Sequence, residues 1–309
     1  MNASWCVSAR LLSAVALLGL APCAREQGAR EQGAREQGAR EQAARPAGAP
    51  VERSSAAGVV GARDAAAPPA AALPAPAAPV FQTRMAGLSV LADERTDAQG
   101  HAHEWIVTRI DLQQHRLQVR ALGDLPFTRL LDDAGLLVAV NGGFFDSSLQ
   151  ASGLLLSGGS LLARERPGGG SGVLAVVKQR AQLLKRGEPL PRGTDFSVQC
   201  GPRLIEAGGA IGIRSDDGQR AARTAACIRD AGRELDLVVT LHKGRRGAGP
   251  GLLQLAQWLT EPLARGEPSG CDAALNLDGG PSTGIVVAGS PELERLPLGP
   301  VPFALVVAR

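Results

Sequence analysis

The chain has 309 residues, of which 44% are hydrophobic and 20% charged, as is ordinary for a globular protein. Only 3% are aromatic and none is tyrosine, which argues against a protein that binds single-stranded nucleic acid by stacking. The formal net charge is +3, and the densest basic cluster, Lys243 with Arg245 and Arg246, is short and flanked by glycines. We interpret this cluster as a solvated loop and expect no nucleic-acid partner.

The N-terminus has the order of a secretory signal. Arg10 precedes an apolar run at residues 11–21, and Pro22, Cys23 and Ala24 follow it. The run is shorter than the ~20 apolar residues of a transmembrane helix, and no later stretch is long enough to span. We expect residues 1–24 to be a signal peptide and the protein to be exported, to the periplasm, the envelope or the medium. The same residues also fit a lipoprotein signal with a lipid anchor at Cys23, although the proline before the cysteine departs from that pattern.

Residues 25–79 have the composition of a tether. The sequence Arg-Glu-Gln-Gly-Ala repeats with a period of five from Arg25, and residues 46–79 are rich in alanine, proline and glycine. Neither part offers enough large apolar side chains for a core, which is typical of a disordered linker. We therefore expect one folded domain, over residues 80–309.

Within this domain the hydrophobic pattern predicts mostly strands. The predicted helix spans residues 252–263, with Pro262 expected to kink or shorten its last turn. The predicted strands form hairpins at residues 105–110 with 115–120 and at 223–228 with 235–241, and stand alone at 136–140, 172–178, 273–277, 284–288 and 302–308. The expected fold class is α+β, a mixed and mostly antiparallel sheet with few helices.

Five cysteines are present, and two of them, Cys6 and Cys23, lie in the signal region. Export permits a disulfide among the remaining three, and we expect Cys200 to pair with Cys227, leaving Cys271 as a free thiol. There is no Cys-x-x-Cys and there are only four histidines, which argues against a structural zinc site.

Two segments share one design, in which a buried apolar strand runs into a polar, glycine-rich corner. The first corner is Asn141-Gly142-Gly143-Phe144-Phe145-Asp146, and the second is Asn276-Leu277-Asp278-Gly279-Gly280-Pro281-Ser282. Each alone is compatible with a tight turn. Together they carry more polar residues and glycines than turns require, and glycines allow backbone to approach a ligand closely.

These two corners resemble the signature motifs of the phosphodiester glycosidase family. Two further segments resemble that family in the same order, Gln199-Cys200-Gly201-Pro202-Arg203-Leu204 and Arg220 with Arg223-Thr224-Ala225. The sequence departs from the family pattern at Cys200, usually a serine, and at Pro281, often a glycine. The resemblance covers residues 109–309 and implies a single catalytic domain that hydrolyses sugar-1-phosphodiesters.

The resemblance, read with the chemistry of the side chains, suggests a role for each residue. Arginine binds phosphate oxygens with a fixed fork of donors, so one or both of Arg203 and Arg223 are expected to hold the phosphate. A phosphate leaving group needs little protonation, because its second pKa is about 6. Asp278 alone is therefore the expected nucleophile or general base, with Asp146 as a second candidate whose alternative role is to cap a turn.

The remaining candidates surround these groups. Asn141 and Asn276 are expected to bind sugar hydroxyls or to orient Asp278. The motifs add Gly142, Gly143, Thr224, Gly279, Gly280 and Ser282 to the substrate-binding set. No cofactor is required, although Asp278 with Asn276 offers oxygen ligands for a divalent cation such as Ca²⁺. His242 follows an apolar strand and is either a structural residue or within reach of the site.

The leading hypothesis is a hydrolase of glycosyl phosphodiesters in envelope or extracellular glycans such as exopolysaccharide. One alternative is a non-catalytic, glycan-binding envelope protein. The other is a metal-assisted phosphodiesterase that cleaves the P–O bond. All depend on whether Asn141, Arg203, Arg223 and Asp278 meet at one cleft.

Overall fold

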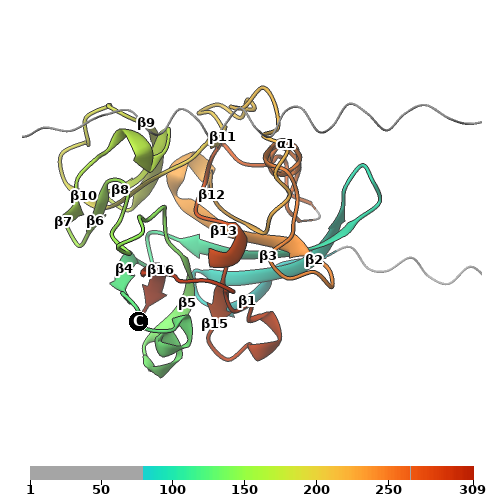
Figure 1. Ribbon diagram of the computed structural model, residues 1–309, viewed down its shortest axis with the longest axis horizontal. Coiled ribbons are helices and arrows are strands. Elements are labelled where there is room, and N and C mark those ends of the chain that lie inside the picture. Colours follow the sequence, from blue (N-terminus) through green and yellow to red (C-terminus); the bar gives the residue numbers. More distant parts are fainter. Residues whose placement is uncertain (1–78, 265) are drawn as a thin grey trace, which may run out of the picture. The chain divides into compact units, whose positions relative to one another are not determined.

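The computed structural model describes residues 79–264 and 266–309. The predicted signal peptide and nearly all of the predicted tether lie outside the described residues. Three sheets make up the fold, and their arrangement is shown in Figure 1. In spatial order, the largest sheet contains β1 (Gln82–Met85), β2 (Leu88–Thr96), β3 (Ala102–Asp111), β13 (Glu234–His242), β12 (Arg223–Arg229), β14 (Ala273–Asn276) and β11 (Arg203–Ile205).

Two smaller sheets complete the structure. The five-stranded sheet contains β7 (Ser160–Ala163), β6 (Leu155–Ser157), β10 (Thr194–Cys200), β8 (Gly172–Val177) and β9 (Arg180–Lys185). The four-stranded sheet contains β15 (Ile285–Val287), β5 (Leu136–Asn141), β16 (Phe303–Ala308) and β4 (Leu117–Ala121).

The fold is mainly β. Every strand pair among the described residues is antiparallel, which confirms the mostly antiparallel prediction. The described part of the chain contains one α-helix, α1 (Leu252–Thr260), so the expected α+β class overstates the helical content. Short 3-10 helices are η1 (Phe127–Asp132), η2 (Pro167–Gly169), η3 (Asp230–Gly232), η4 (Gly280–Ser282) and η5 (Pro291–Leu293). None of the described helices has the length and apolar character needed to span a membrane.

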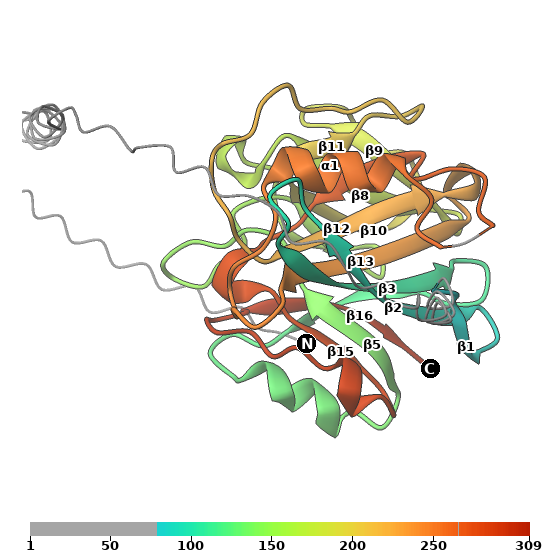
Figure 2. The ribbon, with the colours of Figure 1, turned by 90° about the vertical axis from the view of Figure 1, so that its right-hand side faces the viewer.

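The largest sheet is buried on both faces. Along β12, Ala226 and Ile228 join a core shared with the two smaller sheets, whereas Ala225 and Cys227 pack toward α1. Figure 2 shows this layering, with α1 on one side of β12 and β13 and with β5, β15 and β16 on the other. Burial on both faces explains why β14, which leads to the second corner, is a continuous apolar run. β5, which leads to the first corner, lies in the four-stranded sheet and is also buried along its length.

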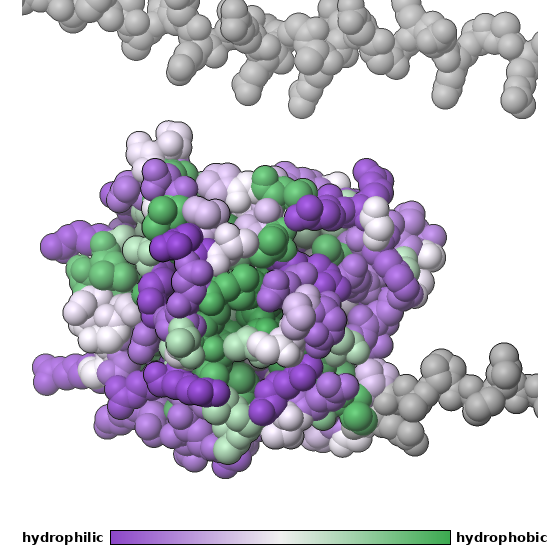
Figure 3. All heavy atoms as spheres, turned by 90° about the horizontal axis from the view of Figure 1, so that it is seen from below, coloured by the Kyte–Doolittle hydropathy of each residue, from purple (hydrophilic) through white to green (hydrophobic). Residues whose placement is uncertain are grey.

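A third apolar cluster lies on the outer face of the four-stranded sheet, where η1 covers part of it. Phe127 and Leu130 of η1 pack there with Ala139 and Val286. Seen from below, the face of the domain has apolar residues at its centre and polar residues around them (Figure 3).

The predicted hairpin at residues 105–110 and 115–120 is wrong. β3 pairs with β2 and β13, whereas β4 pairs with β16 in another sheet. β2, which the sequence pattern did not reveal, occupies the edge of β3 that a hairpin partner would need. The second predicted hairpin, β12 with β13, is confirmed, with η3 as its turn.

Helix α1 ends at Thr260, three residues before the predicted end. Glu261, its C-cap, has the extended value ψ 157°. Proline disfavours helical backbone at the residue before it, so Pro262 ends the helix rather than kinking it.

The predicted Cys200–Cys227 disulfide is wrong, because Cys227 is bonded to Cys271 with a Cα–Cα distance of 5.5 Å. Cys200 is buried in the core between the sheets, whereas Cys227 and Cys271 lie in the cluster beneath α1. The largest sheet thus separates Cys200 from Cys227. Among the three cysteines that the structure describes, the unpaired thiol is Cys200 rather than Cys271.

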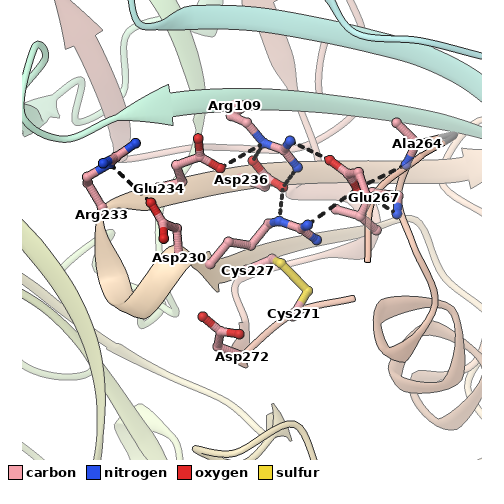
Figure 4. A network of polar contacts seen from close by, with 12 residues as sticks. Arg109, Cys227, Asp230, Arg233, Glu234, Asp236, Ala264, Glu267, Cys271 and Asp272 are labelled. Carbon is pink, nitrogen blue, oxygen red and sulfur yellow. Dashed lines mark hydrogen bonds and ion pairs between the residues drawn. A yellow bond between two sulfur atoms is a disulfide. The ribbon is translucent and has the colours of Figure 1, made fainter. Parts of the chain in front are cut away.

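A network of ion pairs joins the segment before β14 to the largest sheet, close to this disulfide (Figure 4). Arg109 binds the fully buried Asp236 carboxylate with two hydrogen bonds, of 2.8 and 2.7 Å, and also contacts Glu267. Glu267 in turn accepts the backbone N–H groups of Leu263 and Ala264. Although burial alone would lower it, the Asp236 carboxylate raises the pKa of Arg109 above its usual value, so the guanidinium stays charged.

We predict that Arg109→Met lowers the free energy of unfolding by about 3–5 kcal/mol, because it leaves buried carboxylates without their main cation. Denaturant unfolding checks this, with Arg120→Met as the matched control. Arg120 pairs with Asp133 at the surface, and its loss should cost less than about 1 kcal/mol. Equal losses in the two variants would contradict the role given to the network.

We predict that a Cys227→Ser/Cys271→Ser variant loses about 2–4 kcal/mol of stability, whereas Cys200→Ser changes stability far less. Mass mapping of the non-reduced protein should find Cys227 and Cys271 in one cross-linked peptide pair. Recovery of a Cys200–Cys227 peptide pair would contradict the observed pairing.

Candidate functional site

The two glycine-rich corners lie against each other, although they are far apart in the sequence. β5 ends at Asn141, and its side-chain Nδ2 donates a 2.7 Å hydrogen bond to the backbone oxygen of Asp278. The Asp278 N–H donates to the backbone oxygen of Gly142 at 3.2 Å. The central spatial expectation is therefore confirmed for these two segments.

Asn141 is a clamp between the corners. Its side chain is fully buried, and its Oδ1 accepts a 2.6 Å hydrogen bond from Thr224 Oγ1 and a 3.2 Å hydrogen bond from the Gly284 N–H. Together with the bond to Asp278, these bonds pair both the oxygen and the nitrogen of the side-chain amide with groups of the protein. Of the two roles expected for Asn141, the geometry supports the orientation of Asp278, and it gives Thr224 the same supporting role.

Three glycines of the corners are required by close packing, and the fourth by its backbone conformation. A Cβ at Gly142 would lie 2.4 Å from the Phe303 ring, and a Cβ at Gly279 would lie 2.8 Å from the Ala222 oxygen. Gly143 packs against Gln199 in the same way, and Gly280 has a positive φ of 60°. These four positions shape the corners through their backbone, whether or not they also touch substrate.

Asp278 is a half-buried carboxylate without an ion-pair partner among the described residues. Its Oδ1 accepts the Gly279 N–H at 2.9 Å. Burial raises the pKa of the Asp278 carboxyl, and the nearby Ser282 hydroxyl and the Gly279 N–H oppose this rise. The Ser282 hydroxyl donates its one proton to the Pro300 oxygen at 3.2 Å. Such a desolvated carboxylate is suited to act as a base or nucleophile.

Arg223 lies at the start of β12, on the strand next to β14. The pairing of Ala225 with Asn276, continued by two residues, sets Arg223 opposite Asp278. A Cβ at Gly279 would lie 3.7 Å from the Arg223 Cδ, so the guanidinium stem passes directly beside this corner. The backbones of the two candidate residues are therefore adjacent, where β12 begins and just beyond the end of β14.

The charge of Arg223 is buried, and no described acidic side chain lies within ion-pair distance of it. The residue is 7% exposed, and its guanidinium donates to the backbone oxygens of Gln219 at 2.8 Å and of Pro250 at 3.3 Å. Burial lowers the pKa of Arg223, and the charges of Asp217 and Asp216 oppose this. A buried cation is costly unless an anion compensates it, which indicates an anionic ligand here.

Arg203, the other candidate for phosphate, is already engaged. It donates to the Glu206 carboxylate at 3.0 and 2.8 Å and to the Ser171 backbone oxygen at 3.1 Å. Between the two arginines, Arg223 is the one without a described carboxylate within ion-pair distance.

Asp146 caps its own loop. Its Oδ1 accepts the backbone N–H groups of Ser148 at 2.9 Å and Gln150 at 3.0 Å. This is the turn-capping role that the sequence offered as the alternative to catalysis.

Asn276 keeps one polar atom without a partner. Its Nδ2 donates to the backbone oxygens of Gly201 and Leu277, but its buried Oδ1 accepts no hydrogen bond from the described residues. An unpaired buried acceptor of this kind is available to a substrate hydroxyl or a water molecule. Asp278 and Asn276 would give Ca²⁺ one carboxylate and one amide oxygen, and the described residues contain no group of three or more histidines, cysteines or acids placed to hold a metal.

Cys200 is packed between the first corner and β8. Burial raises the pKa of its thiol to about 12, and the Asp278 charge contributes to the rise. At neutral pH the thiol is therefore protonated, and it fills space where the family usually has serine.

Comparison with protein families matches residues 134–308, more than half of the chain, to the phosphodiester glycosidase family. The chain belongs to that family. A phosphodiester glycosidase is a glycosidase-type hydrolase, so this protein is an enzyme and acts on a carbohydrate-type substrate. This confirms the family membership that the four sequence motifs implied.

Two solved structures are similar to this phosphodiester glycosidase. The catalytic domain of zebrafish N-acetylglucosamine-1-phosphodiester alpha-N-acetylglucosaminidase, auto-inhibited by its pro-peptide, has a TM-score of 0.52 and 21% identity over 75% of this chain and 88% of that chain. A hypothetical protein from Synechocystis has a TM-score of 0.51 and 19% identity over 76% of this chain and 64% of that chain. They show a common fold. No curated protein matches the sequence.

We predict that Asp278→Asn raises the free energy of unfolding at pH 7. The pKa of this carboxyl is raised in the folded state, so above the unfolded value, ~3.9, ionisation favours the unfolded chain. The amide removes this penalty and keeps the acceptor for the Gly279 N–H. Denaturant unfolding at pH 7 and pH 3 checks this, because the gain should shrink at pH 3. Destabilisation at pH 7 would contradict the prediction.

Proposed function

We propose that this phosphodiester glycosidase hydrolyses sugar-1-phosphodiester linkages in envelope or extracellular glycans. The observation that carries the proposal is a pair of residues, neither of which forms an ion pair with a described side chain. Arg223 is a buried cation, and Asp278 is a half-buried carboxylate. In a sugar-1-phosphodiester, the phosphate is an anion that can bind Arg223. The anomeric carbon is an electrophile on which Asp278 can act.

The proposed reaction breaks the bond between the anomeric carbon and the phosphate oxygen. Arg223 holds the phosphate oxygens, and Asp278 either attacks the anomeric carbon or takes a proton from the attacking water. The bonding electrons leave with the phosphate monoester, which is stable as an anion and needs no strong general acid. If Asp278 attacks, water then hydrolyses the glycosyl ester and restores the carboxylate. On either route water supplies the hydroxyl of the released sugar, and its other proton passes to solvent.

The Asn141 clamp supports this mechanism. The N–H and the backbone oxygen of Asp278 are both hydrogen-bonded to the first corner. The backbone that carries the carboxylate is therefore held in place. Fixed groups of this kind cost little reorganisation in the transition state.

We also propose that the protein is exported, with residues 1–24 as its signal and with a lipid on Cys23 as the alternative anchored form. The order of residues at the N-terminus supports export. The Cys227–Cys271 disulfide supports it as well, because such bonds persist mainly in oxidising compartments.

The proposal is tested with purified protein and a synthetic sugar-1-phosphodiester. Asp278→Asn should lower kcat/KM by at least ~10³-fold, and Arg223→Gln by about a hundredfold, because it removes hydrogen bonds to a charged group. Arg203→Gln is the matched control, with an expected loss of less than about fivefold, since Arg203 is paired with Glu206. Undiminished turnover by Asp278→Asn would remove this residue from the mechanism.

Hydrolysis in ¹⁸O-labelled water identifies the bond that breaks. Cleavage at the anomeric carbon places the label on the sugar. A label on the phosphate would instead support the metal-assisted phosphodiesterase.

A further inference from the structure

We propose that a pocket beside the second corner binds an anionic group of the same glycan, one repeat unit beyond the scissile phosphodiester. This inference rests on the proposed function and narrows its substrate to a polyanionic glycan. The pocket has a volume of about 480 Å³, within the range of small-molecule sites.

Three separate segments form the walls of the pocket. η4 and the residue after it contribute Gly280 and Thr283, the loop after β13 contributes residues 244–247, and the chain after η5 contributes residues 294–296. His242, at the end of β13, also lines it. The ring of His242 packs against those of His101 and His103, with centroids 5.7 and 5.6 Å apart, and no described contact joins it to Asp278.

Thr283, in these walls, carries a buried polar atom that has no partner among the described residues. The residue is 7% exposed, and the atom is its Oγ1. Buried polar atoms in folded proteins are nearly always hydrogen-bonded, so this hydroxyl indicates a missing partner. A hydroxyl in the wall of a pocket suits a ligand rich in oxygen atoms.

The charged residues of the pocket favour an anion. Arg245 and Arg246 are both exposed, and neither forms an ion pair with any described acidic side chain. Arg295 is paired with Glu104, which leaves Glu294 as the opposing charge, so arginines outnumber glutamates in the lining. The interpretation of the Lys243–Arg246 cluster as a merely solvated loop is therefore incomplete, because two of its arginines border a pocket.

The pocket is adjacent to the proposed catalytic pair. The Gly280 N–H donates a 2.7 Å hydrogen bond to the Ala222 oxygen, and both residues line the pocket. Ala222 precedes Arg223, and Gly280 is two residues after Asp278. The backbone that holds the catalytic pair is thus also a wall of the pocket. A chain whose scissile phosphate lies on Arg223 can place its next anionic group here.

The test uses equilibrium binding by calorimetry in the Asp278→Asn background, which prevents turnover. Four synthetic probes are compared. One is a single sugar-1-phosphodiester, and the others extend it by a repeat that carries a phosphate, a uronate carboxylate or no charge. We expect a charged repeat to tighten binding about tenfold relative to the neutral repeat. The phosphate and uronate probes distinguish the two sources of negative charge.

Arg245→Gln/Arg246→Gln should abolish this tenfold advantage and leave binding of the single-unit probe unchanged. Arg116→Gln/Arg192→Gln removes the same charge from exposed arginines outside the pocket and should retain the advantage. Thr283→Val, similar in shape but without the hydroxyl, should reduce the advantage by about threefold.

Equal binding of charged and neutral probes, or an advantage that survives Arg245→Gln/Arg246→Gln, would overturn the proposal. Failure to detect binding of any extended probe would overturn it as well. These outcomes are distinct from failure of the proposed function, in which the wild-type protein would hydrolyse none of the probes while their binding could still be measured.

Discussion

The candidate site depends on the hydrogen bonds of one buried amide. Asn141 ends a strand of the four-stranded sheet, and its side chain joins the Asp278 backbone to Thr224 of the largest sheet. These bonds connect residues 137 and 83 positions apart, so the site forms only when the sheets have packed. Once made, these bonds hold the backbone of Asp278 in place and leave its carboxylate free to react.

Strand β12 carries two buried arginines whose surroundings differ. Arg229, at its end, lies within 3.8 Å of Asp236 and 3.5 Å of Glu267, in the network next to the disulfide. Arg223, at its start, has only carbonyl oxygens as partners among the described residues. The ion pairs of Arg229 stabilise the fold. Arg223 forms no such pairs, and a bound anion would compensate its buried charge. This contrast within one strand is the strongest physical reason to place a phosphate at the site.

The sequence predicted the parts of the fold that local patterns determine. The apolar strands before Asn141 and Asn276 were found because burial on both faces produces continuous apolar runs. The pairing of β3 with β13 and the Cys227–Cys271 disulfide were not found, because both depend on which sheet face a distant segment occupies. Thr283 was missed for a related reason, since its importance lies in a hydroxyl that packing leaves without a partner.

The roles given to Arg223 and Asp278 are tested most directly by a crystal structure of Asp278→Asn with an intact sugar-1-phosphodiester. If these roles are right, the phosphate oxygens bind the Arg223 guanidinium and the anomeric carbon faces residue 278. A phosphate bound at Arg203, or a sugar whose anomeric carbon points away from residue 278, would contradict them.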